Sequence, residues 1–288
     1  MKAVICTKYG KPDVLQIQDV KNPIIKDNEI LVRIISTAVN SGDTRVRGIA
    51  GEGIMKVVMR LVLGILKPRK PILGTVYSGI VEDTGTKVSK YRKGDKVFGM
   101  TGFSFGTYAE YIAVKETDNV TTMPVNATFD EAVSLIFGGQ TAVYFIEKVK
   151  LSEIKSPEVL IIGATGSVGT AAVQIAQYYG AEITAVCSSK GKDLVKFLGA
   201  SKVIFYDEED FTKQTNQYDF IFDAVGKTSK KQCRMLLKKN GIYKTVGGLE
   251  YASESKKQLD FLKMLFEKGK LKAIIDKTYS LDEIVQAH

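Results

Sequence analysis

The chain has 288 residues, with 41 Lys and Arg against 32 Asp and Glu, three Cys and a single His at its last position. Its length and its 44% of hydrophobic residues are those of a globular protein of two domains, and three scattered Cys argue against a disulfide framework or a cysteine-rich metal site. The longest apolar stretch, residues 54–66, contains two cations and is shorter than the ~20 residues that cross a membrane. The apolar run at the N-terminus is too short for a signal peptide. We therefore expect a cytoplasmic protein without an integral membrane segment.

The formal net charge of +9 is unevenly distributed along the chain. Residues 54–70 contain five cations and no acidic residue, whereas the other charges form a mixed surface of both signs. This pattern favours a phosphate-bearing cofactor over a nucleic acid as the partner of the positive charge. Three interpretations of residues 48–70 stay open: a lid over a substrate cleft, a surface helix that contacts anionic lipid or a partner, and an amphipathic helix that caps the β-rich domain with its lysines in water. The five cations are Lys56, Arg60, Lys67, Arg69 and Lys70.

Short β-rich runs between turn residues occupy the chain up to about residue 122. From Thr128, which begins a helix with acidic residues in its first turn, the pattern changes to alternating strands and helices. Such an alternation predicts a parallel sheet with helices on both faces. The expected strands are 2–7, 14–20, 29–40, 79–82, 96–99, 108–114, 158–163, 182–187, 202–206, 218–223 and 241–246, and the later helices are 167–179, 190–198, 228–238 and 256–268.

The strongest local motif lies at the turn between the strand at 158–163 and the helix at 167–179. Gly163, Gly166 and Gly169 recur at every third position through this turn. In a dinucleotide-binding fold the first glycine permits the tight turn, the second lets the backbone approach the pyrophosphate, and the third lets the helix pack close to the sheet. The spacing is GxxGxxG rather than GxGxxG, and a tight turn without a ligand remains the alternative.

The end of the next strand indicates which dinucleotide binds. NAD-binding proteins place an acidic residue there for the ribose 2′-hydroxyl, but this chain has Ser188, Ser189, Lys190 and Lys192 before its first acid. Two hydroxyls and two ammonium groups suit the 2′-phosphate of NADP, and Tyr206 after the third strand is expected to line the same pocket. The alternative is a polar helix cap followed by surface lysines.

These features, together with motifs spread over nearly the whole chain, resemble the medium-chain dehydrogenase/reductase superfamily and its zinc-free, quinone oxidoreductase-like branch. The resemblance implies an α/β protein with a GroES-like β-rich catalytic domain (1–122, completed by 269–288) and a Rossmann domain with a doubly wound parallel sheet for the cofactor (123–268). It also implies a homodimer. The matching motifs are MKAVICTKYGKPDVLQIQDV at the start, AVNSGDTRVRG, GTVYSGIVEDTG, GDKVFG, GTYAEYIAV, DEAVSLIFGGQTAVY, FDAVG and LKAIIDKTYSLDEIVQAH.

Zinc-dependent members of the superfamily hold catalytic zinc with Cys and His, which this chain lacks at the matching positions. Asn40 stands where a Cys would stand, and Thr75 and Val76 stand where a His-Glu pair would stand. Without a Lewis acid to polarise a carbonyl, we expect hydride transfer from NADPH to a quinone or an α,β-unsaturated carbonyl. The alternatives are an NADPH-binding protein with a structural or regulatory role and little turnover, and an enoyl-thioester reductase. Enoyl-thioester reductases of this superfamily place a Tyr acid shortly after the segment that contains the Asn. The second alternative is disfavoured because no Tyr occurs between Ala38 and Gly74.

The resemblance also implies roles for single residues. Asn40 and Asp43 would lie beside the nicotinamide and the substrate as the catalytic pair, although both could instead organise a turn after a strand. Thr141 would contact the nicotinamide half of the cofactor, or could equally be a buried helix residue. The pyrophosphate would lie against Ser167 and Val168, and backbone groups of Ala224, Val225 and Gly247 would flank the dinucleotide. Relatives usually continue beyond the position of His288 with the end of a helix and a strand that returns to the catalytic domain.

Overall fold

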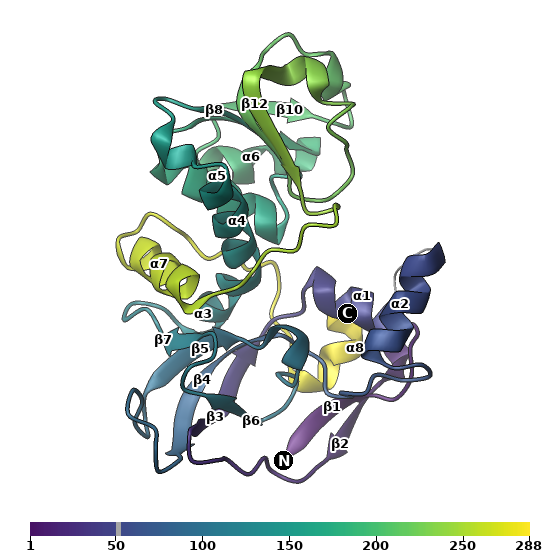
Figure 1. Cartoon of the computed structure of the whole chain (residues 1–288), viewed down its shortest axis with the longest axis vertical. Coiled ribbons are helices and arrows are strands. Elements are labelled where there is room, and N and C mark those ends of the chain that lie inside the picture. The colour runs from purple at the N-terminus through teal and green to yellow at the C-terminus, as the bar shows by residue number, and fades with distance from the viewer. Residues whose placement is uncertain (50–52) are drawn as a thin grey trace. The chain divides into compact units, whose positions relative to one another are not determined.

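The computed structural model describes residues 1–49 and 53–288, which divide into two compact units (Figure 1). The first unit contains Met1–Ile136 and Ile275–His288, and the second contains Phe137–Ile274. A parallel sheet is confined to the second unit, and the first unit is built around antiparallel strands. The mixed α/β architecture with one parallel sheet is therefore confirmed.

The first unit contains an antiparallel sheet with the order β6-β3-β4-β5-β7, and a separate hairpin formed by β1 and β2. Isolated bridges from Ala3 to Ala109 and from Ile5 to Ile72 connect β1 to the loops around the larger sheet. Alternate residues in the first half of β3 are buried, as expected for a strand that covers a core with one face, whereas the first four residues of β4 are all buried. The strands are β1 (Lys2–Cys6), β2 (Leu15–Asp19), β3 (Glu29–Thr37), β4 (Val76–Thr84), β5 (Lys96–Met100), β6 (Tyr111–Lys115) and β7 (Val120–Thr122).

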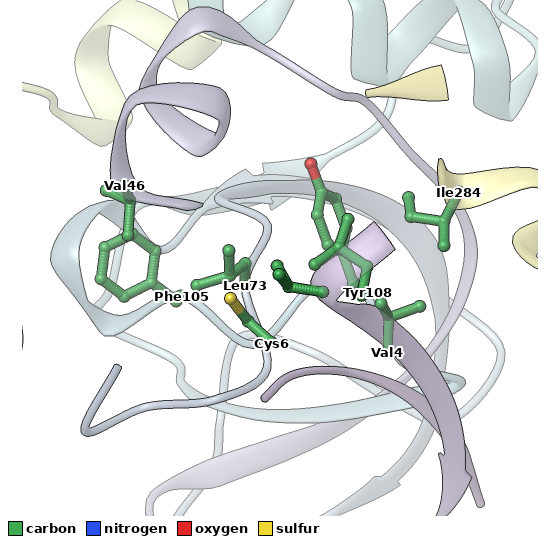
Figure 2. Close-up of a cluster of buried hydrophobic side chains, with 9 residues drawn as sticks. Val4, Cys6, Val46, Leu73, Phe105, Tyr108 and Ile284 are labelled. Atoms are coloured by element: carbon green, nitrogen blue, oxygen red, sulfur yellow. The ribbon is translucent and has the colours of Figure 1, made fainter. Parts of the chain in front are cut away.

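One cluster of buried side chains joins both ends of the chain within this unit (Figure 2). It brings together strand β1, helix α1 (Ser41–Gly48) and the terminal helix α8 (Ile284–Ala287). Each fully buried aliphatic or aromatic side chain contributes roughly 1.5–3 kcal/mol, so the cluster fixes α1 firmly against the β structure. Its members are Val4, Cys6, Val14, Leu15, Val46, Leu73, Phe105, Tyr108 and Ile284. Two further helices of this unit are α2 (Gly53–Leu63) and α3 (Phe129–Ser134).

The second unit contains a parallel sheet with the order β10-β9-β8-β11-β12. The strand order reverses at β8, which pairs with β9 on one side and β11 on the other. In such sheets the ligand binds outside the carboxyl ends of the strands at this reversal. The strands are β8 (Glu158–Ile162), β9 (Glu182–Cys187), β10 (Lys202–Phe205), β11 (Tyr218–Asp223) and β12 (Leu237–Thr245).

Four helices accompany this sheet, namely α4 (Ile136–Lys148), α5 (Ser167–Tyr178), α6 (Lys192–Phe197) and α7 (Lys256–Glu267). Helix α4 approaches the start of α5 closely, since a Cβ atom on Gly138 would overlap the backbone of Ser167. Its next residue, Gly139, leaves room for Leu262 of α7. Helices α4 and α7 therefore pack against one another. The expected βαβ unit at 158–187 is present as β8, α5 and β9.

The predicted helix at 228–238 is wrong. Cys233 donates its backbone N–H to Ser229 in a single helical turn, a 3-10 turn follows at Arg234–Leu236, and Leu237 already pairs with Tyr218 as the start of β12. Cys233 and Leu236 are fully buried beneath the sheet, so pairing and burial outweigh the helix propensity of this segment. The predicted strand at 29–40 likewise ends early, at Thr37, because Asn40 caps α1.

Candidate functional site

The glycine-rich turn follows β8, the strand at which the sheet order reverses. Gly163 has φ 76°, a left-handed conformation that favours glycine, and its N–H donates to the Val186 carbonyl at 2.9 Å. A Cβ atom on Gly163 would overlap the γ-carbons of Val225, which follows β11. The turn is therefore held between the ends of β9 and β11.

Gly166 and Gly169 have different surroundings, although they belong to the same turn. A Cβ atom on Gly169 would overlap the carbonyl oxygen of Gly163, because α5 packs directly on the turn. Gly166 has an ordinary φ of −76°, and among the described residues a Cβ atom there would have the Gly163 oxygen, at 3.6 Å, as its neighbour within 4 Å. Gly169 thus allows α5 to pack closely on the turn, whereas Gly166 faces open space that a ligand can approach.

Helix α5 begins with backbone donors that its N-cap residue does not satisfy. Its N-cap is Gly166, and its first turn carries no acidic residue. The N–H groups of Ser167, Val168 and Gly169 therefore point out at the positive end of the helix dipole. A helix start of this kind, combined with the open glycine turn, is suited to phosphate groups.

The residues predicted for the 2′-phosphate lie beside this turn. Ser188 precedes a 3-10 turn at Ser189–Gly191 and makes no capping hydrogen bond with its side chain, and Lys192 begins α6 with an exposed side chain. A Cβ atom on Gly191 would overlap the Thr165 side chain, so the two loops are in contact. The structure thus brings the serine-lysine loop against the glycine-rich turn.

Ser189 is bound by an acidic residue that sequence reasoning missed. The Asp207 carboxylate accepts the backbone N–H of Ser189 at 2.9 Å and its hydroxyl at 2.8 Å, and this hydroxyl contact lowers the pKa of Asp207. The neighbouring Tyr206 donates its N–H to the Cys187 carbonyl at 3.0 Å and has a 59% exposed side chain. Phe205 pairs with Cys187 in the parallel sheet, so Tyr206 and Asp207, which follow Phe205, lie beside the residues that follow Cys187.

The ends of β11 and β12 are organised by the fully buried Asp223. Its Oδ1 accepts the N–H groups of Val225 and Gly226 at 3.2 and 2.8 Å, and its Oδ2 accepts the N–H and the hydroxyl of Thr228 at 2.8 and 2.9 Å. Ala224 donates its N–H to the Ile162 carbonyl at 3.0 Å. These bonds fix the loop that the sequence assigned to the dinucleotide.

Two further predicted residues lie close to these elements. Gly247 follows β12 in contact with Gly226, because a Cβ atom on either glycine would meet the backbone of the other. Thr141 lies on α4 one turn after Gly138, and its hydroxyl donates to the Phe137 carbonyl at 2.9 Å. All thirteen residues predicted to bind the cofactor therefore belong to the second unit, and all but Thr141 follow the carboxyl ends of its strands.

Asn40 and Asp43 belong to the first unit, where they form a capping box at the start of α1. Asn40 Oδ1 accepts the N–H groups of Gly42 and Asp43 at 2.9 and 3.1 Å, and its Nδ2 donates to the Thr75 hydroxyl at 2.8 Å. Asp43 Oδ2 accepts the Tyr108 hydroxyl at 2.9 Å. Asn40 keeps 9% of its surface exposed, whereas Asp43 is fully buried.

Burial dominates the electrostatics around Asp43. It raises the pKa of Asp43 to about 7, against the opposing effect of the Tyr108 hydroxyl, and it raises the pKa of Tyr108 as well. The His288 ring lies edge-on to the Tyr108 ring, with 5.6 Å between the ring centroids, and Arg47 Nε donates to His288 Nδ1 at 3.3 Å. Burial, together with the Arg47 charge, lowers the pKa of His288 to about 4.

Comparison with known proteins decides the family. A model of the alcohol dehydrogenase GroES-like domain matches residues 26–125, and a model of the zinc-binding dehydrogenase family matches residues 167–280. A 2-methylene-furan-3-one reductase of Solanum lycopersicum is 32% identical over the whole chain, which covers 75% of that protein. The chain is a medium-chain dehydrogenase/reductase.

Within this superfamily the chain belongs to the quinone oxidoreductase-like branch. The solved structure of a quinone oxidoreductase from Coxiella burnetii has a TM-score of 0.84 at 26% identity, over 100% of this chain and 94% of that one. A mitochondrial NAD(P)H oxidoreductase of Mus musculus is 34% identical over 83% of the chain, which spans only 63% of that relative's length. The chain is thus an oxidoreductase of the medium-chain type.

The second family model is named for zinc binding, but Asn40 and Thr75 are not residue types that usually bind zinc. The amide of Asn40 donates to the hydroxyl of Thr75, so these two side chains satisfy one another instead of offering thiolate or imidazole ligands. Within residues 1–49 and 53–288, no group of three or more His, Cys, Asp or Glu side chains is arranged to hold a metal ion. Asn40 and Thr75 therefore offer zinc neither a thiolate nor an imidazole.

Proposed function

We propose that the protein transfers a hydride from NADPH to a quinone or an α,β-unsaturated carbonyl compound without the help of zinc. The observation that carries the proposal is the phosphate cradle of the second unit: the open position at Gly166 lies next to uncapped N–H groups, where the strand order reverses. The names of the relatives supply the acceptor class, because 2-methylene-furan-3-one is an α,β-unsaturated ketone and the Coxiella burnetii protein is a quinone oxidoreductase.

The second unit would hold the cofactor by groups of three kinds. The N–H groups of Ser167 and Val168 would bind the pyrophosphate. Ser188, Ser189, Lys192 and Tyr206 would surround the 2′-phosphate. The backbone of Ala224, Val225 and Gly247 would line the dinucleotide, with Asp223 fixing their loop, and Thr141 would face its nicotinamide half.

NADPH when bound would supply the hydride, so the chain's own residues would have to orient the acceptor and exclude competing reactions. In the first unit Asn40 retains some exposure and is the residue proposed to meet the reactants. Asp43 is buried behind it and holds α1 and Tyr108, so we assign it a positioning role. Water would protonate the product oxyanion.

The decisive experiment compares oxidation of NADPH and of NADH by the purified protein with naphthoquinones, phenanthrenequinone and alkenals. We expect turnover, with NADPH binding at least tenfold tighter than NADH, a difference of ~1.4 kcal/mol. Lys192→Ala should narrow this ratio, whereas Lys196→Ala, one turn further along the exposed side of α6, should not. Tight NADPH binding with no oxidation by any acceptor would instead establish a binding protein of the same fold.

Asp207→Asn should strengthen NADPH binding. The carboxylate of Asp207 holds Ser189 and places a negative charge beside the proposed 2′-phosphate pocket, so its removal should reduce repulsion of the phosphate. We expect three- to tenfold tighter NADPH binding with little change for NADH, measured by fluorescence titration. Glu209→Gln removes a nearby exposed charge that binds Gln214 instead, and is the control. Equal changes for both cofactors would show that Asp207 does not face the phosphate.

A further inference from the structure

The segment from α2 to Lys70 is apolar and exposed, contrary to its interpretation as a helix that caps the β-rich domain. Leu63 packs against the core cluster shown in Figure 2 at the end of the helix. The aliphatic side chains before and after it stand in water, with 80% of Leu66 exposed. The exposed members are Val57, Val58, Leu61, Val62, Ile65 and Leu66, and we call them, with the cations Lys56, Arg60, Lys67, Arg69 and Lys70, the α2 surface.

Hydrogen bonds hold the α2 surface in its exposed conformation. Helix α2 ends at Leu63, and the carbonyl of the next residue, Gly64, accepts the Tyr9 hydroxyl at 2.9 Å. Arg60 Nη1 donates to the Ile65 carbonyl at 2.6 Å, and Arg69 donates its N–H to the Leu63 carbonyl at 2.8 Å. These bonds fold the loop back on the helix end, and the side chains of Ile65 and Leu66 remain 61% and 80% exposed.

A cavity of about 720 Å³ lies beside this loop. The cavity is lined by Ile5 and Cys6 of β1 on one side and by Ile65 and Leu66 of the loop on the other. Near it, Lys70 Nζ donates to the carbonyl of Phe103 at 3.3 Å, and the Phe103 ring is 71% exposed. An aromatic side chain therefore extends the apolar area next to a cation.

The charge of the α2 surface indicates what covers it. No acidic residue occurs anywhere from position 53 to position 81, so the five cations have no acidic neighbour in their own segment. On α2, Val57 and Leu61 are four residues apart, and Lys56 and Arg60 have the same spacing one position earlier, at the edge of the apolar strip. An aliphatic strip edged by cations matches the boundary between anionic headgroups and acyl chains.

We propose that the α2 surface docks on an anionic lipid bilayer as a peripheral contact. None of the helices in the described residues has the length and hydropathy to cross a membrane. The 11-residue α2 would lie in the interface plane, with its aliphatic side chains among the headgroups and its cations on lipid phosphates. This binding is independent of the proposed redox reaction and would place the protein next to acceptors that dissolve in the bilayer.

Vesicle flotation with the full-length protein tests the proposal. We expect binding to vesicles of phosphatidylcholine with 30% phosphatidylserine to be at least tenfold tighter than to phosphatidylcholine alone, and to weaken with added salt. The double variant Leu61→Gln, Leu66→Gln and the triple variant Lys67→Gln, Arg69→Gln, Lys70→Gln should each lose at least fivefold in affinity. All variants should retain the native circular dichroism spectrum and melting temperature.

Matched controls change exposed residues elsewhere. Ile24→Gln alters an aliphatic side chain that is 92% exposed, and Lys230→Gln with Lys231→Gln removes two exposed cations; neither should affect flotation. Equal binding to neutral and anionic vesicles, no binding to either, or full binding by the Leu61, Leu66 variant would overturn the proposal. Self-association that the same leucine variant abolishes, without lipid binding, would assign the surface to a second protein copy instead.

Discussion

Gly169→Ala should lower the free energy of unfolding by about 1–3 kcal/mol, the usual cost of forcing extra volume into a packed site. The added methyl group would overlap the carbonyl oxygen of Gly163, which is backbone and can yield only if the turn shifts. Urea denaturation followed by circular dichroism measures the effect. The turn joins β8 to α5, so we expect its displacement to disturb the packing of the whole second unit.

Gly166→Ala is the matched control for this prediction. Its methyl group would have the Gly163 oxygen at 3.6 Å, an ordinary contact, and its φ of −76° suits any residue, so stability should change by no more than about 0.5 kcal/mol. The same methyl group projects into the space proposed for the pyrophosphate, and NADPH affinity should fall at least tenfold. A stable Gly169→Ala, or a Gly166→Ala that binds NADPH normally, would contradict the roles assigned to the two glycines.

Asp43→Asn should remove a large pH dependence of stability. The folded pKa of about 7 lies above the ordinary value of 3.8, so the buried carboxyl stabilises the fold when protonated, and this contribution is lost as the pH rises through 7. Between pH 5 and pH 8 the wild-type protein should lose about 2–3 kcal/mol relative to the variant. Urea unfolding of both proteins at these two pH values provides the measurement.

Two features make this comparison specific to Asp43. His288 has a lowered pKa of about 4 and acts in the opposite sense, because its neutral form stabilises the fold and this contribution is lost as the pH falls from 6.5 to 4. Since both proteins keep His288, its effect cancels in their difference. Asp193→Asn, which removes an exposed carboxyl from α6, should parallel the wild type at both pH values. Parallel curves for Asp43→Asn would show that the carboxyl is ionised in the folded protein throughout this range.

The βαβ unit at the phosphate cradle was predictable because its signals are local. A buried strand, glycines at fixed spacing and a helix without an acidic first turn occur in one continuous stretch that ends at Cys187. The prediction of a helix at 228–238 was wrong because the deciding contact is distant in the sequence. The residues of this segment are compatible with a helix, but the pairing of Leu237 with Tyr218, nineteen positions earlier in the chain, determines their conformation.

The candidate site shows the same difference between features set by local sequence and features set by contacts distant in the sequence. Residues after successive parallel strands could be assigned to one sheet edge from the sequence, because the carboxyl ends of such strands always lie together. Asp207 was missed because its contact with Ser189 spans eighteen positions and depends on the pairing of β9 with β10. Asp223 could be recognised at a strand end, but the donors that converge on it come from separate loops and strands, including Thr245.

The family, the two kinds of domain and the scarcity of His and Cys could be determined from the sequence alone, since motifs and composition can be read without a fold. The folded arrangement was needed to establish that Gly166 is open while Gly169 is packed, that Asp43 is buried, and that the aliphatic residues of α2 face water. Exposure and close approach depend on what other segments place around a residue, and the spacing of residues along a single segment does not contain that information.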